Sequence, residues 1–93
     1  MGQAIKDSLK HYIQSRLKAA ERGDKDAYYD LGLMYSTGQG VDQNYIVAHK
    51  WFNLAAMQGM KRAVVDRAEI ATEMDSIQIA EAQREARDWQ AAH

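Results

Sequence analysis

An internal repeat constrains this chain more than any other feature of its sequence. The segment AAERGDKDA at residues 19–27 aligns with AAMQGMKRA at residues 55–63 at an offset of 36 residues, with five identical positions. A period of this length is typical of helical solenoids, in which each unit buries its apolar face against its neighbours. The sequence therefore predicts a short repeat array.

Apolar residues recur at helical spacing along most of the chain. Between residues 3 and 22 they form one stripe, made of Ile5, Leu9, Tyr12, Ile13, Leu17 and Ala20. Similar stripes predict helices over residues 25–37, from Asn44 up to Gly59, from about 60 to 71, and from 76 to about 91. The chain has no proline, and no strand pattern competes with this assignment.

Local signals mark where these helices begin. Asp24 and Asn44 are suited to cap the second and third helices, and Asp75 with Gln78 matches a variant of the capping box. We therefore expect an all-α fold, a right-handed α-α superhelix of about five antiparallel helices. A single domain, 1–93, would contain a half repeat (1–23), a complete repeat (24–59) and a degenerate capping repeat (60–93).

Two glycines two residues apart, Gly38 and Gly40, interrupt the helical pattern in the segment STGQGVDQNY. They fit either a ligand loop or a corner between helices. A phosphate loop would need Gly-x4-Gly-Lys-Ser/Thr, and a dinucleotide fold would need Gly-x-Gly-x-x-Gly after a strand, and the sequence has neither. We interpret the glycines as a corner that takes positive φ, with Val41 tucked beneath it.

The segment from Ala27 to Ala63 reads A-x3-L-G-x2-Y-x2-G-x-G-V-x6-A-x2-W-x3-A-A-x2-G-x3-A and resembles the Sel-1-like repeat (SLR), a relative of the tetratricopeptide helix pair. The matching residues are Ala27, Leu31, Gly32, Tyr35, Gly38, Gly40, Val41, Ala48, Trp51, Ala55, Ala56, Gly59 and Ala63. The family usually has Asp where this chain has Asn44, and both residues cap helices. The ending IAEAQREARDW is similar to the closing helix of bacterial SLR proteins.

The aromatic residues at the repeat positions are expected to lie in the core. Tyr35, Trp51 and Phe52 occupy positions that pack a helix pair together. Trp51 should share a seam with two small alanines, and its indole N–H should find a backbone carbonyl or a polar side chain of the preceding helix pair.

The resemblance also implies a binding surface. In tetratricopeptide proteins the first helix of each pair lines a concave groove, and this register would point Asp26, Tyr29, Leu33 and Ser36 into it. Tyr28 and Tyr29 are neighbours on one helix, so we expect one to pack and the other to be exposed. Tyr29 and Leu33 would suit an anchoring patch for a peptide or helix. The alternative is that a terminal helix covers them.

Composition excludes several classes of function. The 12 basic and 13 acidic residues nearly cancel, which disfavours nucleic-acid binding. The absence of cysteine excludes disulfides, thiolate catalysis and cysteine-ligated zinc. No apolar run is long enough to insert across a membrane, and no secretory signal is visible. We therefore expect a cytoplasmic protein, with the periplasm or secretion as the alternative for a processed fragment.

No group of residues in the sequence forms a recognisable catalytic or metal site. The three histidines, His11, His49 and His93, are widely spaced, and the pairs Glu69/Glu73 and Glu81/Glu85 lack the Glu-x-x-His of di-iron bundles. Ser36 and Thr37 have no readable Ser-His-acid arrangement. We predict no catalytic residue, no metal and no cofactor.

The resemblance implies a non-catalytic protein–protein interaction module, an SLR adaptor or scaffold that holds a peptide or helix of another protein in its groove. One alternative is a structural module that self-associates into a homo-oligomer. Another is a small hydrolase-like SLR enzyme, although the cysteine-rich members linked with that activity need cysteines that this chain lacks.

Overall fold

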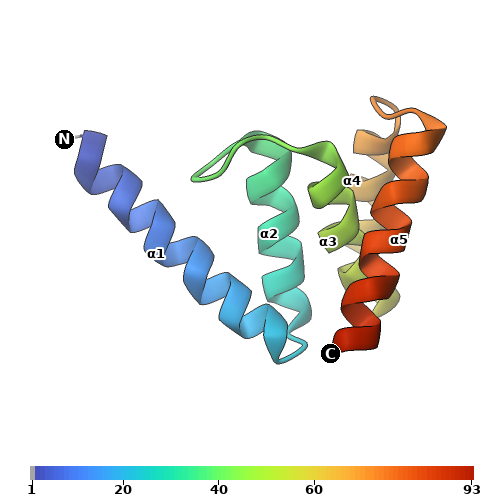
Figure 1. Cartoon of the computed structure of the whole chain (residues 1–93), viewed down its shortest axis with the longest axis horizontal. Coiled ribbons are helices and arrows are strands. Elements are labelled where there is room, and N and C mark those ends of the chain that lie inside the picture. Colours follow the sequence, from blue (N-terminus) through green and yellow to red (C-terminus); the bar gives the residue numbers. More distant parts are fainter. Residues whose placement is uncertain (1) are drawn as a thin grey trace.

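The computed structural model describes residues 2–93, except for the side chain of Gln3, and shows five helices in this range (Figure 1). They are α1 (Gly2–Glu21), α2 (Lys25–Thr37), α3 (Tyr45–Met57), α4 (Lys61–Ala71) and α5 (Ser76–Ala92). No strand occurs within residues 2–93, and only the turn around Gly59 separates α3 from α4. The all-α prediction is confirmed. The division at residues 23 and 59 stays a prediction, and Met1 lies outside the described residues.

The predicted caps form at three helix starts. The Asp24 carboxylate accepts hydrogen bonds from the backbone N–H groups of Asp26 and Ala27, and Asn44 Oδ1 accepts one from Val47 N–H. Asp75 and Gln78 make both halves of the capping box. These bonds satisfy N–H groups that have no partner within the helix, which is why the helices begin at these residues.

The two glycines form a corner between α2 and α3. Gly38 ends α2 with φ of 78°, and its N–H donates to Met34 O at 2.8 Å. Gly40 also has a positive φ, 77°. A Cβ atom on Gly40 would lie 3.0 Å from Leu9 Cβ, so the turn also lies against α1. The corner interpretation is confirmed, and the contact with α1 is an addition that the sequence did not indicate.

We expect Gly40→Val to lower the free energy of unfolding by about 1 kcal/mol or more, because a β-branched residue is strained at this φ. The added side chain would also crowd Leu9. Thermal unfolding measures the loss. Gly2→Val is the control, since a Cβ at Gly2 meets nothing within 4 Å. An unchanged midpoint for Gly40→Val would contradict the geometric role of this glycine.

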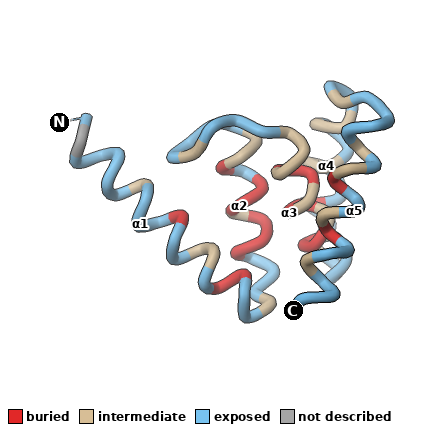
Figure 2. Tube along the Cα trace, viewed as in Figure 1, coloured by how far each residue is buried: buried red, intermediate tan, exposed pale blue. Residues whose placement is uncertain are grey.

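The core is centred on α3, which packs against α2, α4 and α5, whereas α1 packs mainly against α2. The largest fully buried side chains are Leu31 of α2 and Phe52 of α3. Figure 2 shows buried positions along α2 and α3, while the first half of α1 is mostly exposed. Ile5, in that half, is 62% exposed. The core is therefore shared by α2–α5 and the second half of α1.

Candidate partner-binding site

A surface hollow of about 520 Å³ lies between α2 and the start of α4. Its lining residues are Lys25, Asp26, Tyr29, Asp30, Leu33, Met60 and Arg62. Five of them belong to α2, Met60 is the N-cap of α4, and Arg62 lies in the first turn of α4. Two cationic and two anionic side chains therefore surround two apolar ones and a tyrosine.

Tyr29 is the fixed part of this hollow. Its ring is only 8% exposed and packs against Phe52, with ring centroids 5.6 Å apart. The Arg62 guanidinium lies 4.9 Å from the ring centroid, and Arg62 Nη2 donates to the Tyr29 hydroxyl at 3.4 Å. The hydroxyl in turn donates to Asp66 Oδ2. Burial, followed by the hydrogen bond to Asp66, raises the pKa of Tyr29.

The structure corrects the predicted exposure of the tyrosine pair. Both Tyr28 and Tyr29 are buried, at 5% and 8% exposure, although one was expected to face solvent. Trp89 of α5 donates its indole N–H to the Tyr28 hydroxyl at 3.4 Å, while Arg62 and Asp66 of α4 hold Tyr29. Helices distant in sequence thus cover both rings, and Tyr29 is not a free anchoring side chain.

The other predicted groove residues differ in position. Leu33 is 38% exposed and lines the hollow, and Asp26 lies beside it in the first turn of α2. Ser36 is not among the lining residues, and its hydroxyl donates to Leu33 O at 3.0 Å. A serine hydroxyl bonded to its own helix is common, and the sequence does not distinguish it from a free one.

Arg62 is the lining residue that sequence reasoning could have found. It lies 36 residues after Asp26, which is the repeat offset, so the two residues occupy equivalent places on the first helices of successive pairs. The periodicity of α2 also places Asp30 one turn after Asp26. Asp30 accepts a hydrogen bond from Arg16 Nη1 of α1 at 3.3 Å, which links the rim of the hollow to α1.

A second group of aromatic side chains joins α3 to α5. Trp51 is 3% exposed, stacks on Tyr28 with centroids 5.8 Å apart, and meets Trp89 edge-on at 4.8 Å. The Lys50 ammonium lies 4.6 Å from the Trp51 centroid and 5.1 Å from that of Trp89. Burial lowers the Lys50 pKa, although Glu85 opposes this shift. These contacts are packing between helices.

The core positions of Trp51 and Phe52 are confirmed, but one expected hydrogen bond is wrong. Trp51 Nε1 is buried and has no acceptor among residues 2–93. The Trp51 ring packs on aromatic rings of two other helices, Tyr28 of α2 and Trp89 of α5. A buried N–H without a partner carries a cost, typically about 1–3 kcal/mol.

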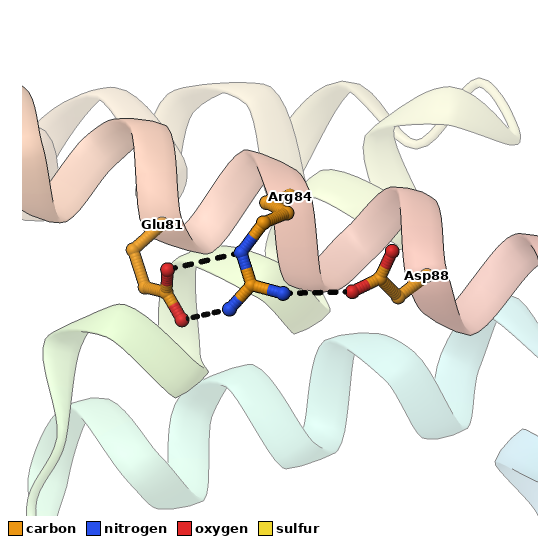
Figure 3. Close-up of polar contacts among 3 residues, drawn as sticks. All are labelled: Glu81, Arg84 and Asp88. Atoms are coloured by element: carbon orange, nitrogen blue, oxygen red, sulfur yellow. Dashed lines mark hydrogen bonds and ion pairs between the residues drawn. The ribbon is translucent and has the colours of Figure 1, made fainter.

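Two carboxylates of α5, Glu81 and Asp88, take part in surface ion pairs (Figure 3). Arg84 donates two hydrogen bonds to Glu81 and one, 2.9 Å long, to Asp88 Oδ2. The hydrogen bonds from Arg84 lower the pKa of Glu81. Within residues 2–93, no three His, Cys, Asp or Glu side chains gather as a metal site would require. Glu81 therefore lies on a charged face of α5, whereas Glu85 is half-buried and burial raises its pKa.

His49 is a buried histidine whose environment favours the neutral ring. It is 4% exposed, and its Nδ1 has no partner among the described residues. Burial, and secondarily the Arg67 cation, lower the His49 pKa. Arg67 is held nearby by a hydrogen bond to Asn53, one turn after His49.

We expect the free energy of unfolding to fall as the pH drops below about 6.5, the ordinary histidine pKa. The unfolded chain protonates His49 at a higher pH than the folded chain does, because the folded-state pKa is lowered. The contribution of His49 is thus fully present above about pH 6.5 and is lost as the pH falls toward the folded-state pKa. Urea midpoints across this range measure the effect.

His49→Leu should give a flatter pH profile than the wild-type chain. His11→Leu is the matched control, because His11 is exposed on α1 and should keep the wild-type profile. If His49→Leu and the wild-type chain lost stability in parallel, another group would be responsible for the pH dependence.

Residues 25–60 match the family model described as the Sel1 repeat. The matched range runs from the start of α2 to the N-cap of α4 and contains the glycine corner and Trp51. This stretch of the chain is a Sel1-like repeat (SLR). The resemblance in the repeat residues is thereby confirmed.

Two known proteins resemble this chain over a longer stretch. Chitin synthase regulator SKT5 of Saccharomyces cerevisiae (strain ATCC 204508 / S288c) is 40% identical over 52 residues, which are 56% of this chain and 8% of SKT5. The crystal structure of c5321, a protective antigen present in uropathogenic Escherichia coli strains, displays an SLR fold. The structural match covers 86% of this chain and 17% of the c5321 chain, with a TM-score of 0.81 and 26% sequence identity.

The chain thus spans a small part of the length of both proteins. The structural match confirms an all-α helical-repeat superhelix. SLR repeats generally act as protein–protein interaction modules, and the fold is typically non-catalytic. No helix within residues 2–93 has the length and apolar character needed to cross a bilayer.

Proposed function

We propose that this SLR chain binds a peptide segment of a partner protein in the hollow between α2 and α4. The observation that carries the proposal is the exposed Leu33 beside the fixed group of Tyr29, Arg62 and Asp66. An exposed apolar side chain beside a rigid, ordered wall is the arrangement that keeps the entropic cost of binding low.

The lining residues indicate how a peptide would be held. Leu33 and Met60 offer apolar contact for one side chain of the partner. Asp26 and Lys25 lie on the α2 rim, so they suit polar groups on either side of that side chain. Such polar groups around an apolar centre set orientation and specificity more than affinity. The proposed activity is adaptor binding without chemistry.

The test replaces the exposed leucine. A partner that co-purifies with the intact chain is produced in pure form and titrated calorimetrically against the wild-type chain and Leu33→Arg. We expect an affinity loss of about tenfold or more, since a charged side chain would stand where the apolar contact forms.

Ile77→Arg is the matched control. Ile77 is an exposed apolar residue on α5, 79% accessible, and it does not line the hollow. It should retain wild-type affinity, and circular dichroism should show that both variants are folded. Equal affinities for the wild-type chain and Leu33→Arg would place the partner elsewhere and reject the proposal.

Self-association is the second candidate. It is favoured by exposed apolar residues at both ends of the array, Ile5 on α1 and Val65 on α4, at 62% and 57% exposure. Two copies stacked end to end would cover such residues. Sedimentation over a range of concentrations tests this, and a monomer at every concentration would reject it.

A further inference from the structure

A second hollow, separate from the one between α2 and α4, lies between the first half of α1 and the glycine corner. Its volume is about 480 Å³. Its lining residues are Lys6, Leu9, Lys10, Gly38, Gly40, Val41 and Asp42. In Figure 1 the first half of α1 diverges from α2, and the corner that follows α2 extends toward it.

The base of this second hollow is apolar. Leu9 and Val41 are both half-buried, and Val41 packs against the core. Gly40 brings the turn close to α1, since a Cβ there would lie 3.0 Å from Leu9 Cβ and 3.6 Å from Leu9 O. The α1 wall and the glycine corner therefore meet at the base of the hollow, where Leu9 and Val41 form an apolar floor.

The α1 wall is positively charged. Lys6 and Lys10 are one helical turn apart, both are exposed, and neither forms an ion pair with another described residue. Like charges at this spacing repel each other mildly, and an anion placed between them would relieve that repulsion. Asp42, on the turn, is the carboxylate of the opposite wall. An incoming acid is thus favoured on the α1 side.

We propose that this second hollow binds an acidic peptide segment of a partner protein. One apolar side chain of the peptide lies on Leu9 and Val41, and its carboxylates face Lys6 and Lys10. The charge complementarity of the α1 wall selects this occupant over a neutral or basic peptide. The site goes beyond the proposed function, because it shares no lining residue with the hollow between α2 and α4.

The experiment selects ligands for this second hollow directly. A random peptide library displayed on phage is panned on the full chain, with counter-selection against the double variant Lys6→Glu/Lys10→Glu. Surviving peptides are synthesised and titrated by fluorescence anisotropy. The matched control is Lys18→Glu/Arg22→Glu, which makes the same charge change at the same spacing, at residues that line neither of the two hollows.

We expect the surviving peptides to carry Asp or Glu around an apolar residue. Their affinity should fall about tenfold or more for Lys6→Glu/Lys10→Glu and less for the neutral Lys6→Gln/Lys10→Gln. It should stay at the wild-type level for the control pair and weaken with added salt. Circular dichroism verifies that each variant is folded. If Lys6→Glu/Lys10→Glu is not folded, the comparison is made with Lys6→Gln/Lys10→Gln instead.

Three results would overturn the inference. No peptide survives the counter-selection, or the survivors show no excess of acidic residues. The third result is a wild-type chain that dimerises as its concentration rises, together with a Lys6→Glu/Lys10→Glu variant that does not. A second copy of the chain would then be the occupant of this hollow. Leu33→Arg should still bind these peptides, because Leu33 does not line the second hollow. The two proposed binding sites can therefore be rejected independently of each other.

Discussion

Replacing Trp51 with alanine is expected to remove a large part of the free energy of unfolding. Its ring is 3% exposed and packs between Tyr28 and Trp89, so the substitution leaves a cavity where three helices meet. Removing a buried tryptophan typically costs about 3–5 kcal/mol. A domain of this size has a total stability of roughly 5–14 kcal/mol. Circular dichroism and urea titration measure the loss.

Trp51→Phe is the matched control. Phenylalanine keeps an aromatic ring in the seam and removes the buried N–H that has no acceptor, so we expect a clearly smaller loss. A ligand-stacking tryptophan would behave differently, since its loss would spare the fold. Native helicity with a near-native melting point in Trp51→Ala would show that Trp51 is a binding residue rather than a core residue.

Gly32→Val should cause the second largest loss of stability. A Cβ atom on Gly32 would lie 2.4 Å from two ring carbons of Phe52, which is itself among the most buried residues. Overpacking a core commonly costs about 1–3 kcal/mol. Here the α2 and α3 backbones would have to separate, so we expect about 3 kcal/mol. A lower urea midpoint, with an unchanged dependence of the unfolding free energy on urea concentration, measures this loss.

Gly32→Ala separates packing from helix propensity. Alanine in place of a helical glycine normally stabilises by about 0.5–1 kcal/mol, yet the same Cβ meets the Phe52 ring. We expect a net loss, smaller than that of valine. A midpoint equal to or above that of the wild-type chain would mean that Phe52 moves aside at little cost, contrary to the close packing proposed for α2 and α3.

Much of the fold could be predicted because its signals are local. The caps at Asp24, Asn44 and Asp75 each depend on residues within three positions along the chain, and the glycine corner depends on backbone geometry. The 36-residue repeat offset also indicates that the helices stack in pairs. Together these signals gave the five helices and their order.

The candidate site was less predictable because its chemistry comes from distant segments. Tyr29 is on the first helix of the complete repeat, but its exposure is decided by Arg62 and Asp66 more than 30 positions later. The Trp51 N–H likewise lacks its expected acceptor among the described residues, and the sequence does not show which groups of other helices surround it. Helical periodicity places a side chain on a face, but it does not reveal what covers that face.

The central position of α3 affects how the chain opens. Long solenoids behave as chains of separable units, since each repeat meets only its neighbours. Here α2, α4 and α5 all pack against one helix, so none of them can detach without exposing part of the same core. Amide protons in α3 should therefore exchange with solvent only through global unfolding, while the first turns of α1 exchange through local fraying.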